Sequence, residues 1–177
     1  MNTFTKVAIS AGMVVSSAIA TDRAAIGVGA NILAPTGIII QTRITPQIKM
    51  PVTLSYTSTS AIVDKDDETS NISNYTLGVA PQFIFAASEE MEAAAGLNLG
   101  LIASTLGGTF KDAPEDSDAS FFIGPVLSVE YFFIKNFSLS GNFALTYTKQ
   151  FEDKHDNDFG GSSLSTGSGV VFSWYFQ

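Results

Sequence analysis

Two charged side chains lie inside stretches in which apolar and small residues alternate. Arg43 stands two residues after Gln41, and Glu130 stands two residues after Ser128. Successive side chains of a strand point to opposite faces, so each charge shares the small, polar face of its strand. No other charge is expected on the polar faces of the strand interiors. An unpaired charge in a narrow interior is costly, so such groups pair or keep water.

We therefore expect an ion pair or polar network that plugs the interior of the fold. The alternative is that each charge is separately solvated near a strand end. The candidate members of the network are Arg43, Glu130, Gln41, Gln47, Gln82, Asn98 and Asn142.

The only histidine, His155, lies among Asp153, Asp156 and Asp158. Histidine and aspartate near a serine could activate a hydroxyl nucleophile for acyl transfer. The chain has no Gly-x-Ser-x-Gly nucleophile motif, however, and a histidine in a polar loop is ordinarily solvated. We expect no enzymatic activity, and a lipid-modifying enzyme is the alternative.

Two acidic runs, 64–68 and 115–118, offer oxygen ligands of the kind that Ca²⁺ and Mg²⁺ prefer. Neither run has the spacing and glycine of an EF-hand loop. The stretch Gly27-Val28-Gly29 is not followed by a helix carrying Lys or Ser/Thr, so it is no phosphate-binding loop. We expect neither a metal site nor a cofactor.

The composition is acidic and lacks cysteine. The 177 residues carry 17 Asp and Glu against 9 Lys and Arg, and most of the acids cluster in three polar stretches. Nucleic-acid binding needs basic patches, so nucleic acid is excluded as a partner. Without cysteine, hydrogen bonds and packing must hold the fold, and lipid attachment through an N-terminal cysteine is excluded.

The first twenty residues have the features of a secretory leader. Lys6 is their only charge, the segment 7–20 is apolar or small, and Ala18-Ile19-Ala20 matches a cleavage site. We expect a signal peptide at 1–20 and one domain at 21–177; a retained N-terminal anchor is the alternative. No other run approaches the ~18 apolar residues of a spanning helix.

The stretch 121–147 predicts two long strands joined by a turn at Lys135-Asn136. Apolar side chains recur at every second residue, and the intervening positions are mostly small or polar. Each strand has ~13 residues, against a usual five or six and the ~9–11 tilted residues that cross a bilayer. One apolar face and one polar face are typical of a strand that lies between lipid and a packed lumen.

The same alternation predicts eight strands, so the expected fold class is an all-β, eight-stranded, antiparallel, up-and-down transmembrane barrel. A turn is preferred over a short helix for 86–92. Long polar loops at 63–73, 107–120 and 150–163 alternate with short turns; the first connection, at 33–36, is short where a long one is expected. The predicted strands cover 24–32, 38–48, 52–62, 75–85, 93–101, 121–134, 137–148 and 169–176.

Aromatic residues stand at both ends of the oily rows, as at the two interfaces of a membrane. The outer set is Tyr75, Phe121 and Tyr147, and the inner set is Phe83, Phe85, Tyr131, Phe133, Phe137, Trp174 and Phe176.

The segments 124–132 and 137–147, with the ending Val170-x-Phe172-x-Trp174-x-Phe176, resemble small bacterial outer-membrane barrels of the OmpA/OmpX-like superfamily. The resemblance implies a monomer in the outer membrane of a Gram-negative-type cell, in contact with its lipids and lipopolysaccharide. It also implies that Phe172, Trp174 and Phe176 form the C-terminal signal read by the barrel-assembly machinery. This chain departs from the pattern in Gln177, which follows the last aromatic residue.

A soluble lipocalin-like barrel is the rival fold, but its lumen would have to hold too many large apolar groups. Pro46, Pro81 and Pro125 cannot donate to a strand ladder and are expected at bulges or strand ends. The expected function is structural or surface-interacting, through acidic outer loops. The alternatives are an outer-leaflet lipid-modifying enzyme and a narrow channel for ions or small solutes.

Overall fold

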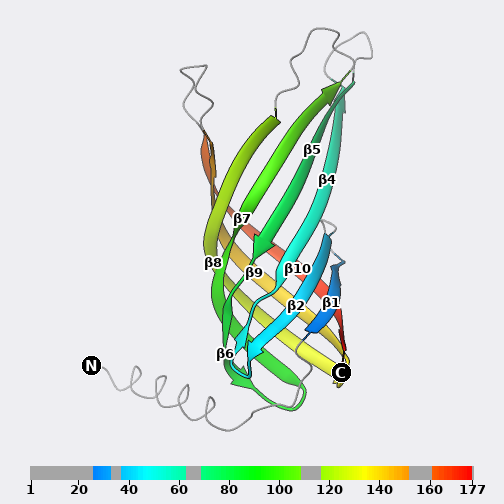
Figure 1. Cartoon of the computed structure of the whole chain (residues 1–177), viewed down its shortest axis with the longest axis vertical. Coiled ribbons are helices and arrows are strands. Elements are labelled where there is room, and N and C mark those ends of the chain that lie inside the picture. Colours follow the sequence, from blue (N-terminus) through cyan, green and yellow to red (C-terminus); the bar gives the residue numbers. More distant parts are fainter. Residues whose placement is uncertain (1–25, 33–36, 63–68, 109–116, 152–160, 177) are drawn as a thin grey trace, which may run out of the picture.

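A computed structural model describes residues 26–32, 37–62, 69–108, 117–151 and 161–176. The expected leader at 1–20 and most of the three expected loops lie outside these residues. Figure 1 shows an elongated barrel whose strands are strongly tilted. No helix in the described part is long and apolar enough to cross a membrane.

The described elements are all strands. They are β1 (Ile26–Asn31), β2 (Gly37–Thr45), β3 (Ile48–Lys49), β4 (Val52–Ile62), β5 (Thr69–Val79), β6 (Gln82–Ala87), β7 (Met91–Gly108), β8 (Ser117–Ile134), β9 (Phe137–Gln150) and β10 (Ser162–Phe176).

The sheet closes into a ring of eight strand positions. All pairings are antiparallel, β1 pairs with both β10 and β2, and β2 pairs with β4. Two positions are each built from two segments, because β3 continues the line of β4 and β6 continues that of β5. The predicted eight-stranded antiparallel barrel is confirmed.

Two predicted turns are misplaced, and the error matters for the interior. The chain turns at Pro46-Gln47 and not at 49–51, so Lys49 lies within β3. The turn between β6 and β7 occupies 88–90, where the Met91 N–H donates to Ser88 Oγ at 3.0 Å. Because β7 begins at Met91, Glu92 also lies within a strand.

Several strands continue into stretches that were expected to be loops. Residues 69–73 belong to β5, 107–108 to β7, 117–120 to β8 and 162–163 to β10. These ends are rich in Ser, Thr and Asn and lack the apolar alternation of the lower strands. Alternation is needed only where one face of a strand is apolar and the other is not, so the pattern can end before the hydrogen-bonded ladder does.

The three prolines meet the ladder in different ways. Pro46 lies in a turn, and Pro81 lies in the break between β5 and β6. Pro125 lies inside β8, where the register to β9 is the same before and after it, so the expectation of a bulge at this residue is wrong. The bulges of the described ladders fall elsewhere, near Ile44, Phe85 and Phe133.

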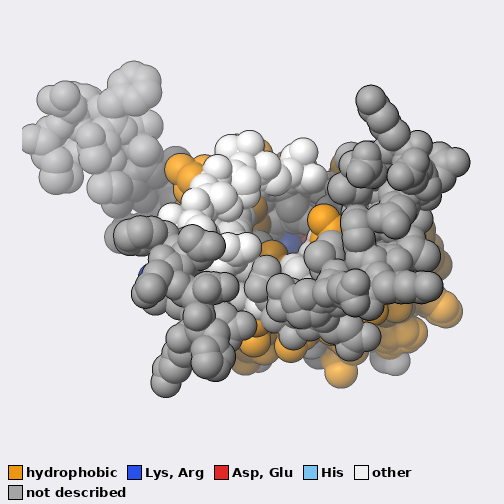
Figure 2. Space-filling view, turned by 90° about the horizontal axis from the view of Figure 1, so that it is seen from above, with side chains coloured by type: hydrophobic (Ala, Val, Ile, Leu, Met, Phe, Trp, Pro, Cys, Tyr) orange, Lys and Arg blue, Asp and Glu red, His pale blue; other side chains and the backbone are white. Residues whose placement is uncertain are grey.

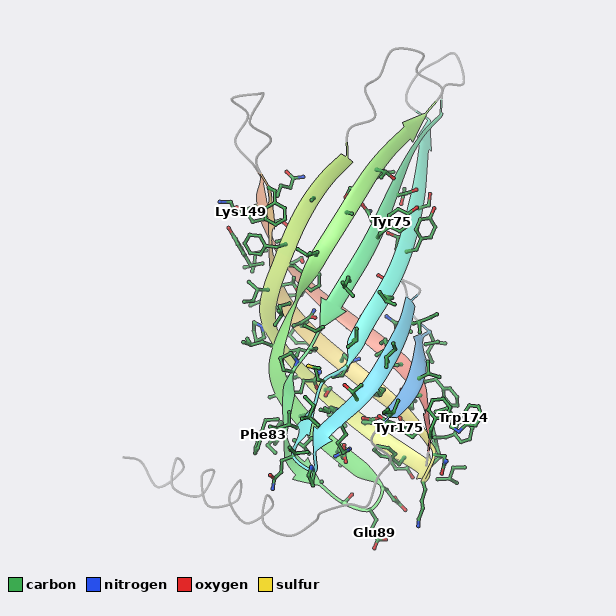
Figure 3. The ribbon with its side chains drawn as sticks, viewed as in Figure 1. Tyr75, Phe83, Glu89, Lys149, Trp174 and Tyr175 are labelled. Carbon is green, nitrogen blue, oxygen red and sulfur yellow. The ribbon has the colours of Figure 1, made fainter. Side chains whose placement is uncertain are left out.

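The large apolar side chains point outward, as the alternation predicts. Neighbouring Trp174 and Tyr175 point to opposite sides of β10, Trp174 outward and Tyr175 into the barrel (Figure 3). Leu101, Leu127 and Phe143 are each more than half exposed on the outer face. Inside, the described residues include ten buried polar or charged side chains and eight buried hydrophobic ones. The barrel is therefore inverted relative to a soluble globular protein.

Gly124 allows β9 to approach β8 closely. A Cβ at Gly124 would lie 1.7 Å from the Leu145 carbonyl oxygen, whereas one at Gly141 would meet nothing within 4 Å. We expect Gly124→Ala to lower the free energy of unfolding by about 1–3 kcal/mol because of overpacking. Gly141→Ala, the matched control, should change it by less than about 0.5 kcal/mol. Urea titration in lipid vesicles measures both, and equal effects would contradict the close approach.

Candidate functional site

The inner end of the lumen, which is the end at the short turns, holds two buried ion pairs. Their four residues come from four strands. Arg43 Nη2 on β2 donates to both carboxylate oxygens of Glu92 on β7, at 2.7 Å each. Lys49 Nζ on β3 donates to Glu130 Oε2 on β8 at 3.1 Å. The side chains of both glutamates are fully buried, and those of Arg43 and Lys49 are 8% and 7% exposed.

The four charges form a square of like and unlike neighbours. Glu92 and Glu130 are direct partners in the β7–β8 ladder, and Arg43 and Lys49 are direct partners between β2 and β3. Like charges directly opposite each other on adjacent strands repel. Each repulsion is offset only because the cationic side of the barrel faces the anionic side across the lumen. The two ion pairs therefore depend on each other.

Hydroxyl groups complete the shell of Glu130. Ser138 Oγ on β9 and Tyr175 Oη on β10 both donate to Glu130 Oε1 at 2.6 Å. Room for the tyrosine comes from β1, because a Cβ at Gly27 would lie 2.8 Å from Tyr175 Cδ1. A buried carboxylate with three donors, one of which is its countercharge, is well satisfied, and this makes its burial tolerable.

A second layer of uncharged groups lies next to the charges. Gln41 Nε2 donates to Ser173 Oγ at 3.3 Å, across the glycine-lined face of β1, and Ser128 Oγ donates to Gln82 Oε1 at 2.6 Å. Together the two layers take side chains from every position of the ring except β1, which contributes glycines. The network thus closes the inner end of the lumen with protein groups.

On the other side of this network the lumen contains a polar cavity of about 230 Å³. Lys49, Gln41 and Gln82 border it from below, and Asn98 and Asn142 line its walls. Seen from above, the barrel is hollow at its centre, with a basic side chain at the bottom of the hollow (Figure 2). In the described part of the chain the lumen is therefore cup-shaped, closed at the turn end and open at the loop end.

The residues expected to form one network lie in different parts of the lumen, and one of them lies outside it. Arg43 and Glu130 both lie in the lumen but do not pair with each other. Gln41 and Gln82 join the hydrogen-bonded layer, and Asn98 and Asn142 line the cavity without joining it. The expectation for Gln47 is wrong: this residue lies exposed in the turn after β2.

Sequence reasoning missed Lys49 and Glu92, so the expectation that Arg43 and Glu130 are the only inward charges is wrong. A signal for both existed. The alternation of Ala94, Gly96 and Asn98 continues backward to Glu92, and an outward Ile48 places the next residue inward. The expected turns at 49–51 and 86–92 included these two residues, so the alternation was not extended to Lys49 and Glu92.

The other candidates from the sequence lie apart from this site. His155 and the acidic runs 64–68 and most of 115–118 lie outside the described residues. Within the described part, no three His, Cys, Asp or Glu side chains are grouped so that they could hold a metal. Phe172, Trp174 and Phe176 are exposed on the outside of β10, and the Trp174 ring stacks on Phe137 with centroids 5.7 Å apart.

No family model and no curated protein matches this sequence. Similar solved structures include the following three. CarO of Acinetobacter baumannii is 13% identical (TM-score 0.41; 87% of this chain and 98% of that chain covered), and CarO2 of the same organism is 12% identical (0.43; 85% and 98%). Ail of Yersinia pestis, solved with the heparin analogue sucrose octasulfate, is 12% identical (0.46; 85% and 92%).

The three structures resemble this chain over most of its length, at low sequence identity and with TM-scores below 0.5. The assignment of the fold rests on the strand pairing of this chain.

Removal of one charge should be worse than removal of a whole pair. We expect Lys49→Met to lower the free energy of unfolding by about 3–5 kcal/mol, because Glu130 is left uncompensated beside Glu92. The double variant Lys49→Met/Glu130→Gln should regain most of this loss, since no unpaired charge remains. Urea unfolding in vesicles measures the cycle, and a double variant as unstable as the sum of the single ones would refute the coupling.

Proposed function

We propose that this chain is a non-enzymatic integral protein of the bacterial outer membrane, a plugged barrel that acts at the cell surface through its loop end. The observation that carries the proposal is the inversion of the barrel, with apolar side chains outside and charges inside. Over the part of the barrel where β1 pairs with both β10 and β2, the ring is closed, and a closed ring is the form in which strands cross lipid.

The exposed surface carries aromatic residues in two bands. Phe83 and Trp174 lie near the turn end, and Tyr75 lies toward the loop end (Figure 3). Tyr56 extends the outer band, because its ring packs on that of Tyr75 with centroids 5.1 Å apart. Leu77, Leu101 and other exposed aliphatic residues lie between the bands. Aromatic residues favour the two interfaces of a bilayer, so the bands support a membrane-spanning position.

The closed inner end favours a surface role over transport. Eight strands enclose an interior only wide enough for side chains, and here ion pairs and hydroxyls fill its inner end. The ends that continue beyond the outer aromatic band lead into acidic sequence, including the runs 64–68 and 115–118. We propose these acidic segments as the part that meets the surroundings of the cell.

The location implies a route and a set of neighbours. We propose export through a cleaved signal peptide at 1–20, insertion by the barrel-assembly machinery through Phe172, Trp174 and Phe176, and a monomer surrounded by outer-membrane lipids and lipopolysaccharide. The exposed aromatic row at the end of β10 supports the assembly signal.

A charge at mid-height of the outer face tests the membrane position. Leu127 is 54% exposed in the middle of β8, and Leu164, 68% exposed, lies at the loop end of β10. In a bilayer, Leu127→Arg should cost about 2–4 kcal/mol and Leu164→Arg only about 0–1 kcal/mol. Folding into vesicles, followed by urea titration and heat-modifiable gel migration, measures both. Equal tolerance of the two arginines, or a folded chain that needs no membrane, would contradict the proposal.

The plug predicts how the barrel conducts. We expect no steady conductance from the wild-type barrel in planar bilayers, because the network closes the inner end. Arg43→Ala/Glu92→Ala removes one ion pair with both large side chains and should open a steady conductance. Arg43→Lys, which keeps the charge, is the control and should stay closed. An unchanged leak in the double variant would end the plug hypothesis, and a conducting wild type would favour the channel alternative.

A further inference from the structure

Among the residues that the structure describes, the wall of the barrel is incomplete at the loop end. β1 and β2 stop well below the upper ends of β4 and β10 (Figure 1). On β10 the pairing with β1 ends at Val171, with a last hydrogen bond from the Ile32 N–H to the Val170 carbonyl at 2.8 Å. On β4 the pairing with β2 ends at Ser55. Above these points, residues 56–62 and 162–169 each have one described neighbouring strand, β5 and β9 respectively.

The sequence of these two free edges fits an opening. Residues 162–168 of β10 are all exposed, on both faces, whereas the facing half of β9 keeps alternate residues half-buried. Both free edges consist mainly of Ser, Thr and Gly, on the outer face as well as the inner. Rows of Ser, Thr and Gly are typical of a water-filled opening and not of a lipid-facing surface.

The opening leads to the polar cavity of the lumen. Gly167, Ser168 and Gly169 on the free edge of β10 line that cavity, as does Asn31 at the end of β1. Because N–H and C=O groups alternate in direction along a strand, Ser168 and Thr166 present theirs to the same side as Val170. The backbone groups at the opening thus lack a strand partner in the described part of the chain and are available to hydrogen-bond a ligand.

The walls of the cavity also carry free amides. Within the described residues the side chains of Asn98 and Asn142 make no hydrogen bond, although both line the cavity. Lys49, the one charge at its border, is neutralised by Glu130. Amides, hydroxyls and backbone groups without net charge match an uncharged, hydroxyl-rich group such as a hexose.

Outside the barrel, an apolar groove begins at the same place. It has a volume of about 760 Å³ and is lined by Ala30, Ile38, Leu54, Tyr56, Leu77 and Leu101, among others. Ser55 on β4 and its ladder partner Thr76 on β5 line both this groove and a second, inner cavity of about 300 Å³, so the two spaces lie on opposite faces of the same part of the sheet. Tyr56 and Tyr75 place the groove at the outer aromatic band.

We propose that the opening between β4 and β10 is a lateral binding site for an amphiphile, with its uncharged sugar headgroup in the lumen cavity and its acyl chain in the groove. The inference rests on the proposed membrane position, because the groove then faces the outer leaflet. A free sugar has the same headgroup chemistry, and the test separates the two sources.

Two glycines provide a matched pair of variants. Gly167 lies on the inward row of β10 with Val171 and Tyr175, and Gly141 is exposed on the outer face of β9. A Cβ at either position meets nothing within 4 Å. Gly167→Trp should therefore place its ring in the passage with no clash at Cβ, and Gly141→Trp adds the same side chain to the outer surface.

The experiment is native mass spectrometry of the folded barrel in a zwitterionic detergent. The probes are monogalactosyl diacylglycerol, the diacylglycerol with the same chains, and methyl galactoside. We expect wild type and Gly141→Trp to retain the glycolipid in preference to both other probes. Gly167→Trp should weaken its binding about tenfold or more, and Asn142→Leu about fivefold through a lost hydrogen bond.

Three results would overturn the inference: glycolipid and diacylglycerol binding equally, methyl galactoside binding as tightly as the glycolipid, or Gly167→Trp behaving like Gly141→Trp. Heat-modifiable migration of each variant shows that it is folded. A barrel that folds in membranes but binds none of the probes contradicts this inference alone, whereas failure of the Leu127→Arg test contradicts the proposed function.

Discussion

The need to pair every backbone N–H and C=O away from water governs this structure. Strands surrounded by lipid meet that need only by closing on themselves, and the ring from β1 through β10 back to β1 does so over the lower part of the barrel. Closure then decides where side chains go. Alternate residues must face a narrow interior, which admits small, polar or mutually compensating groups, while the other row faces outward.

The charges at the inner end follow from closure. Glu92 and Glu130 are brought side by side by the β7–β8 ladder, a placement that would be unfavourable alone. The hairpin of β2 and β3 brings Arg43 and Lys49 opposite them, and the ring holds the two halves at bonding distance. The result is a neutral, hydrogen-bonded plug in which each part depends on the closure of the whole sheet.

At the loop end, backbone N–H and C=O groups must also find partners, but neighbouring strands do not supply all of them. There the β1–β2 hairpin is too short to pair with the full lengths of β4 and β10, and the edges left over are made of Ser, Thr and Gly. Backbone groups at such edges need water or a ligand. The described residues thus form a barrel that is closed at one end and open at the top and side, and the proposed amphiphile site uses that asymmetry.

Much of this could be read from the chain alone. Period-two alternation established the strands, their number, their order, and which face is oily, because each side chain of a strand reports its own face. The sequence shows that the connection at 33–36 is exceptionally short. It does not show that the upper parts of β4 and β10 are therefore left without a neighbouring strand between them, because these two strands are about a hundred residues apart. Likewise Arg43 and Glu130 were identified as inward charges, but their partners were not.

The sequence by itself thus determined the strand content, the inverted barrel and the presence of buried charge. Only the tertiary structure decided which charges pair, where the lumen is closed and where its wall is open. The physical reason is that alternation is a local property of consecutive residues. Pairing across a lumen depends instead on register and turn position. A turn that begins at Pro46, three residues earlier than expected, changes Lys49 from a turn residue into part of the plug.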